Sequence, residues 1–178
     1  MKELELPNIK KEEFGFEGEI QLEVWSKFGS SQDDAISELE RKSYLIDIGG
    51  DMVEDNPSIK LEHVNAYNYL IENQEKIKAN ILTAIIDEYP KLIKQKGNLV
   101  SESPKFLTFT GLQGLIRLST IHILNVEKND FAYVGYEFDT PLDKEHGLGI
   151  MTHQDRIVEI GDADTSFLSW IARKDKEA

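Results

Sequence analysis

The residues best suited to chemistry lie close together near the end of the chain, between Asp139 and Asp164. Seven acids and two cations give this stretch a charge of −5, and two histidines add groups that titrate near neutral pH. Carboxylates and imidazoles are the side chains that bind divalent metals and exchange protons at neutral pH. The ionisable members of the stretch are Asp139, Asp143, Lys144, Glu145, His146, His153, Asp155, Arg156, Glu159, Asp162 and Asp164.

One interpretation of this stretch is a metal site. The candidate ligands are Asp143, Glu145, His146 and His153, with Asp162 or Asp164 completing an oxygen-rich shell for calcium, manganese or zinc. The two histidines are seven residues apart, so a regular strand at about 3.3 Å per residue would separate them by over 20 Å and place them on opposite faces. A shared ion therefore requires a bend. The simpler interpretation, which we favour, is a set of solvated turns in an acidic protein.

A second interpretation is acid–base catalysis, with Glu145 and His146 as the candidate catalytic pair. Neighbouring residues on a strand point to opposite faces, so the two cooperate only in a turn, which Pro141 and Gly147 predict here. A metal-assisted hydrolase is the enzymatic function that these residues would support. The competing interpretation is that His146 hydrogen-bonds its own loop, and we consider this the better one.

Other catalytic and cofactor classes lack their residues. The chain has no cysteine, which excludes thiolate metal sites and cysteine nucleophiles and fits a reducing compartment. It has no phosphate-binding loop, and Ser166 lacks the flanking glycines of a nucleophile elbow. We expect no cofactor. Asp162, Asp164 or Thr165 is instead expected to cap a final helix.

The net charge suits a basic protein partner, although the simpler interpretation is that acidity serves solubility, as in many cytoplasmic proteins. With 20 basic and 33 acidic residues the charge is −13, which opposes binding to nucleic acid and to an anionic membrane. Aromatic anchors inside a charged rim would suit a protein interface, although most of Trp25, Tyr133, Tyr136 and Trp170 are expected in the core. The candidate partner-binding residues are Asp139, Asp143, Glu145, Asp162 and Asp164.

The first half of the chain predicts two strands. Alternation from Glu19 puts Ile20, Leu22 and Val24 on one face of a strand, and residues 44–48 form a second short apolar run. A loop follows Gly29 and a short helix is expected over 35–43. Residues 1–17 and 173–178 are expected to be frayed.

Helical spacing dominates the middle of the chain. Ser58 is placed to cap a helix, and the apolar stripe leaves His63 on the polar, exposed side. One long helix and two helices both fit, and we favour a break near Asn73 that forms a helical hairpin ending at Gly97. The stripe consists of Leu61, Val64, Tyr67, Ile71, Ile77, Ile81, Ile85 and Tyr89.

The last part of the chain predicts a run of strands at 118–126, 131–138, 146–153 and 156–160, with a turn at 128–130. A connection over 98–114 precedes them and a helix over 165–172 follows. His122 is expected to face solvent or a partner on the side opposite the core. The sequence thus predicts one α+β domain over 1–178, in which an N-terminal strand pair and a C-terminal antiparallel meander of about four strands carry a helical pair on one face.

Three segments resemble a group of small bacterial domains of unknown function. They are the aromatic strand 133–138, the turn Asp143-Lys144-Glu145-His146-Gly147-Leu148-Gly149 and the hairpin strand that runs on through 156–165. In that group a Trp often precedes the Asp, where this chain has Leu142. The resemblance covers about residues 58–168. It implies a bacterial, cytoplasmic α+β protein without assigned catalytic residues, similar in some members to immunity proteins that bind and neutralise a toxin. The charged start of the chain, which is unlike a secretory signal, also leads us to expect a cytoplasmic protein.

Overall fold

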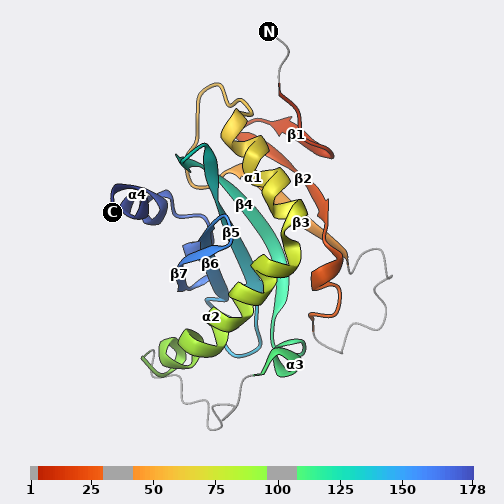
Figure 1. Ribbon diagram of the computed structural model, residues 1–178, viewed down its shortest axis with the longest axis vertical. Coiled ribbons are helices and arrows are strands. Elements are labelled where there is room, and N and C mark those ends of the chain that lie inside the picture. Colours follow the sequence, from red (N-terminus) through yellow and green to blue (C-terminus); the bar gives the residue numbers. More distant parts are fainter. Residues whose placement is uncertain (1–3, 30–41, 96–107) are drawn as a thin grey trace.

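The strands lie side by side in the order in which they occur in the sequence (Figure 1). A computed structural model describes residues 4–29, 42–95 and 108–178, and in these residues the fold is α+β, as predicted. The sheet has seven strands: β1 (Ile9–Glu12), β2 (Gly15–Gln21), β3 (Ser43–Gly49), β4 (Arg117–Lys128), β5 (Phe131–Asp139), β6 (Leu148–His153) and β7 (Arg156–Gly161). The helices are α1 (Leu61–Glu72), α2 (Gln74–Gln95), α3 (Phe109–Leu112) and α4 (Ser169–Glu177), with two 3-10 turns, η1 (Glu23–Trp25) and η3 (Ala163–Ser166).

One pair of neighbouring strands differs from the rest. All neighbours pair antiparallel except β3 and β4, which are parallel. Parallel strands need a crossover connection, and here the chain crosses through α1, α2 and α3. The sheet therefore consists of two antiparallel units joined along β3 and β4.

The main core lies between the sheet and the crossover helices. Side chains alternate along β3, so Tyr44 and Ile46 face the helices and are buried, while Leu45 faces the other way. In α2 the predicted stripe is confirmed, with Ile81 and Ile85 fully buried.

The predicted stripe is only partly confirmed for α1: Val64 and Tyr67 pack half-buried against the main core, but Leu61 and Ile71 are exposed. The buried residues of α1 are His63, Ala66 and Leu70, whereas Leu61 is 59% exposed. Ser58 does not cap the helix, which begins at Leu61; His63 Nδ1 instead accepts a hydrogen bond from the backbone N–H of Lys60 at 3.1 Å. His63 therefore accepts a hydrogen bond from the residue that precedes its own helix, and its side chain is buried instead of exposed to solvent.

Helices α1 and α2 meet at the predicted break, but they do not form the expected hairpin. They follow one another across the sheet (Figure 1). Asn73 turns its side-chain amide back to the carbonyl of Tyr69, 2.9 Å away, and this single residue separates the helices. Each helix packs on strands, α1 on β4 and β5 and α2 on β7, so burial does not require a hairpin. The predicted end at Gly97 lies outside the described residues.

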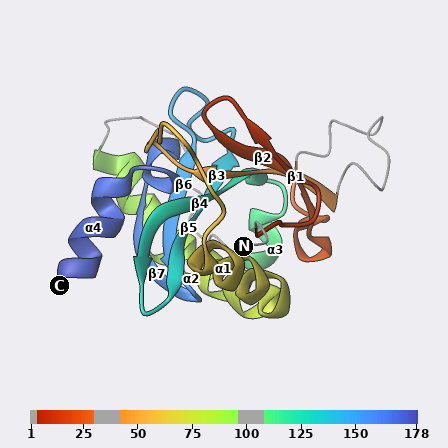
Figure 2. The same ribbon diagram turned by 90° about the horizontal axis from the view of Figure 1, so that it is seen from above.

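The opposite face of the sheet carries a smaller core under α4. Ile171 and Ala172 of α4 pack on Leu124, Tyr133 and Met151. In Figure 1, α4 lies beside the β4–β7 end, away from β1 to β3, and Figure 2 shows it well separated from α1. Trp25, Tyr133 and Tyr136 are buried, which confirms the expectation that most of these aromatic residues lie in the core. Trp170 is the exception at 53% exposed, because α4 turns Ile171 and Ala172 inward. Among residues 4–29, 42–95 and 108–178, α4 and the segment before it cover only part of this second face.

Two glycines let the chain before α4 lie directly on the strands. A Cβ at Gly135 would lie 1.5 Å from the carbonyl oxygen of Ser166, and one at Gly149 would lie 2.3 Å from that of Asp162. Because any side chain there would clash with main-chain atoms, the glycines fix the height of η3 above the sheet.

The ends of the chain are more regular than the sequence predicted. β1 and the start of β2 fall within 1–17, and α4 covers most of 173–178. Asp175 in α4 receives hydrogen bonds from Arg156 at 3.0 and 2.5 Å and from the hydroxyl of Tyr133 at 2.8 Å. The Arg156 bonds are the main reason that the pKa of Asp175 falls to about 2. The helix expected at 35–43 and the first part of the 98–114 connection lie almost wholly outside the described residues, and no described helix is long and apolar enough to span a membrane.

The cap of α4 comes from a distant segment, which gives a stability prediction. Asp162, Asp164 and Thr165 do not cap α4; the carboxylate of Asp51 accepts hydrogen bonds from the backbone N–H of Ser169, at 2.9 Å, and from its hydroxyl. We expect Asp51→Ala to lower the free energy of unfolding by about 1 kcal/mol, or the melting temperature by roughly 2–4 °C. Thermal unfolding followed by circular dichroism measures this. Asp55→Ala, in the same exposed loop, is the control and should leave the melting temperature unchanged.

Candidate functional site

The predicted turn between β5 and β6 is present. Asp143 is 5% exposed and accepts a hydrogen bond from the backbone N–H of His146 at 3.1 Å, and the same oxygen lies 3.0 Å from Nδ1 of the His146 ring. Gly147 closes the turn with a φ of +65° and donates its N–H to the carbonyl of Asp143. His146 thus bonds its own loop, which is the interpretation favoured from the sequence.

This turn lies beside the segment that follows β7. The backbone N–H of Ala163 donates to the carbonyl of His146 at 2.9 Å. Four partly or fully exposed acids therefore gather at one end of the sheet, which we term the acidic end: Asp139, Glu145, Asp162 and Asp164. Asp143, also a predicted partner-binding residue, does not belong to it because its carboxylate is buried.

His153 does not join this group. It ends β6, five residues beyond Leu148, so at about 3.3 Å per residue roughly 16 Å of strand separates it from the turn. Its Nε2 lies 2.8 Å from the carbonyl of Lys128, and its ring packs on Tyr133. The proposed ligand set Asp143, Glu145, His146 and His153 is therefore not assembled. Among the described residues no group of three or more His, Asp or Glu side chains is arranged to hold a metal ion.

A cavity of about 380 Å³ opens beside the turn. Its charged lining residues are Arg117, Asp139, Asp143 and Lys144, two cations and two acids. The charges of the lining residues sum to zero, so the cavity does not favour a cation over an anion. Glu145 and His146, the candidate catalytic pair, do not line it. The cavity and the predicted acid–base residues therefore do not form one active site.

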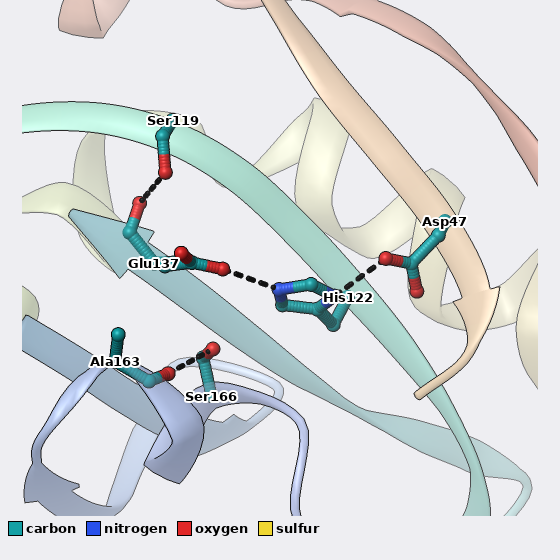
Figure 3. Close-up of polar contacts among 6 residues, drawn as sticks. All are labelled: Asp47, Ser119, His122, Glu137, Ala163 and Ser166. Carbon is teal, nitrogen blue, oxygen red and sulfur yellow. Dashed lines mark hydrogen bonds and ion pairs between the residues drawn. The ribbon is translucent and has the colours of Figure 1, made fainter. Parts of the chain in front are cut away.

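The most polar arrangement on the sheet centres on His122, whose partners the sequence did not reveal. His122 is 7% exposed and lies between two carboxylates on the neighbouring strands (Figure 3). Its Nδ1 is 2.6 Å from Oδ2 of Asp47 on β3, and its Nε2 is 3.1 Å from Oε2 of Glu137 on β5. The ring of Phe167 meets the imidazole edge-on at 5.3 Å between centroids. His122 faces away from the main core, as predicted, but Phe167 shields it from solvent.

Register explains this cluster. Asp47 lies directly opposite His122 in the parallel pair, while Glu137 is opposite Thr120, two residues away on the same face. Each of the three has an apolar or aromatic residue immediately before and after it in its strand. Such isolated polar residues were the signal in the sequence, and the predicted turn at 128–130 placed β5 beside β4. Nothing in the sequence indicated that β3 lies on the other side of β4.

The two carboxylates set the charge of His122. Burial by itself would lower its pKa, but the hydrogen bonds to Asp47 and Glu137, with their charges, raise the pKa to about 9. The ring is therefore an imidazolium at neutral pH, with both N–H groups donating to carboxylates. It has no free lone pair to act as a base or metal ligand.

Ser166 does not extend the cluster into a nucleophilic triad. Its hydroxyl donates to the carbonyl of Ala163 at 2.6 Å (Figure 3). The group Asp47, His122 and Glu137 is consequently an ionic tie across three strands rather than an activated catalytic site.

Comparison with known proteins gives a family without a function. Residues 15–168 match the model of a domain of unknown function, DUF6985. The chain belongs to this family. The matched region runs from β2 to the residue before α4 and so contains both the ionic tie and the β5–β6 turn. No curated protein and no solved structure matches the chain.

The ionic tie predicts a loss of stability at high pH. Since the folded-state pKa of His122 is raised from 6.5 to about 9, its contribution is complete below pH 6.5 and disappears as the pH rises through 9. The full loss is roughly 3 kcal/mol, at 1.36 kcal/mol per pKa unit. Urea unfolding of the wild type and of His122→Asn, at several pH values from 6 to 10, measures the difference. The difference in the free energy of unfolding between the two proteins should become smaller as the pH rises. A difference that stays constant from pH 6 to 10 would contradict the ionic tie.

The separation of His153 from the turn predicts the response to metals. Ions that bind only the folded state raise the melting temperature. We expect no rise with calcium, manganese or zinc, and no difference between the wild type and Glu145→Ala or His146→Ala. A rise of several degrees in the melting temperature with one of these metals, abolished by either variant, would contradict this prediction and support a metal site at the turn.

Proposed function

We propose that the protein is a non-enzymatic binding module that recognises a basic protein partner through its acidic surface, as an immunity protein neutralises a toxin. The observation that carries this proposal is the acidic end. The Ala163–His146 hydrogen bond joins the β5–β6 turn to the segment after β7, and the acids of the acidic end are partly or fully exposed there. We further propose a bacterial, cytoplasmic setting, which the absence of cysteine suits.

Charge supports the choice of partner. The net charge of −13 attracts a basic surface over several ångströms and accelerates its association, while it repels nucleic acid. Exposed carboxylates held on strand ends and tight turns lose little conformational entropy when they bind. These properties suit a stoichiometric inhibitor, whose charge and shape are complementary to those of its target.

Metal-assisted hydrolysis is the weaker alternative. Asp143 and His146 do contact each other at the predicted turn, but Asp143 is buried, His153 is at the far end of β6, and His146 does not line the adjacent cavity. A hydrolase would need ligands that the described residues do not bring together.

The proposal is tested by affinity capture from the cell of origin. The bait is the wild type or the triple variant Asp139→Lys, Glu145→Lys, Asp164→Lys, and the control bait is Asp55→Lys, Glu72→Lys, Asp87→Lys, which has the same net charge. We expect one stoichiometric basic protein with the wild type and the control, lost with the triple variant and in 0.5 M salt. Recovery of no stoichiometric protein, or of one that the triple variant retains, would contradict the proposal.

A further inference from the structure

One part of the sheet has no partner within the described chain. Helices α1 and α2 cover one face, and η3 and α4 cover the other face only over β4 to β7 (Figure 1). The uncovered area, which we term the open face, carries the outward residues of β2 and β3 and the adjoining residues of β4 and β5. Its outward residues are Glu17, Glu19, Gln21, Ser43, Leu45, Asp47, Thr120 and Glu137.

Leu45 is the unusual residue of the open face. It is 58% exposed, whereas Tyr44 and Ile46 on either side are buried in the main core. In the register of the sheet it lies between Glu19 on β2 and Thr120 on β4, so a large apolar side chain stands among polar ones. An exposed aliphatic side chain inside a polar and charged rim offers a partner apolar area to bury at the centre of a contact.

The charges of the open face specify what can cover Leu45. Glu17, Glu19, Asp47 and Glu137 give four negative charges. The imidazolium of His122 offsets one of them, and Lys10 on β1, directly opposite Glu17, offsets another, so the face stays negative. A second copy of this acidic chain would be repelled. A surface that presents lysine or arginine around an apolar side chain would gain both charge pairing and burial of Leu45.

The face is also preorganised. The tie of Asp47, His122 and Glu137 holds β3, β4 and β5 together at one edge of the open face, and Ser43 donates a hydrogen bond to Glu19 at 3.0 Å on the other edge. Carboxylates already fixed by such bonds require little ordering when a partner arrives.

We infer that the open face, with Leu45 at its centre, is the docking surface for the basic partner; this inference rests on the proposed function. At about 4.8 Å between strands and 3.3 Å per residue, four strands of up to seven residues cover at most roughly 440 Å². A stable interface needs about 800 Å² on each side. The partner therefore extends beyond the open face, and the acidic end adjoins it, because the carbonyl oxygens of Asp162 and Ala163 lie against Gly149, which is opposite Glu137. Leu45 acts as the central anchor and the acidic end as part of the rim.

The test uses a defined probe, a fluorescently labelled 14-residue helical peptide of leucine and lysine with all leucines on one face. Leu45→Ser is compared with Leu61→Ser, which removes an equally exposed leucine on α1, at 58% and 59%. Both positions are exposed, so both variants should fold, which their melting temperatures verify. By fluorescence anisotropy in 0.1 M salt we expect Leu45→Ser to weaken binding at least tenfold, with Leu61→Ser within twofold of the wild type.

A second pair of variants separates the anchor from the charge. Glu17→Lys on the open face should weaken binding severalfold, and Glu72→Lys on α1, with the same change in net charge, should weaken it less. Equal effects within both pairs would overturn the inference. Affinity that responds to Asp139→Lys and Asp164→Lys but not to Leu45→Ser would also overturn it, while the proposed function survives. No binding of the peptide to the wild type would count against both.

Discussion

The parallel pairing of β3 with β4 is the constraint on which the rest of the structure depends. Parallel neighbours cannot be joined by a tight turn, so the chain between them must cross the sheet. It does so through α1, α2 and α3 and thereby covers one face with the main core. The same pairing brings Asp47 directly opposite His122, and Glu137 reaches the other side of the ring from β5. One junction therefore determines both where the core forms and where the buried charges meet.

The second face is shaped by how closely the last segment approaches the strands. Without side chains at Gly135 and Gly149, η3 lies directly on β5 and β6, and its backbone bonds to the turn before β6. That contact places Asp162 and Asp164 beside Glu145 and so creates the acidic end. Asp51 then starts α4 at Ser169, and Asp175 fastens the helix to β5 and β7. Because α4 occupies only the β4–β7 end, no other described element covers this face of β2 and β3.

The two polar centres of the molecule have different energetic roles. The tie at His122 is shielded and uses both ring nitrogens, so its contribution is to hold three strands in register. The acids outside the tie, which are those of the acidic end together with Glu17 and Glu19 of the open face, are partly or fully exposed to water. There, charge pairs add little to stability but influence encounter with another molecule. This division supports the proposal of a binding protein: the buried charges stabilise the framework, and the exposed charges remain available to a partner.

The sequence by itself determined the features that depend on neighbouring residues. Alternation located β4 to β7, the glycine and proline around Asp143 predicted the turn, and Asn73 marked the break between helices. These predictions succeed because periodicity and turn chemistry depend on residues that are only a few positions apart in the sequence. The phase of α1, which buries His63, and the capping of Ser169 by Asp51 were missed, since both depend on contacts outside the local pattern. Only the tertiary structure decided that His122 lies between Asp47 and Glu137, that His153 is far from His146, and that Leu45 faces solvent. Each follows from which strands are neighbours and from what covers each face, and the order of apolar residues along a strand does not contain that information.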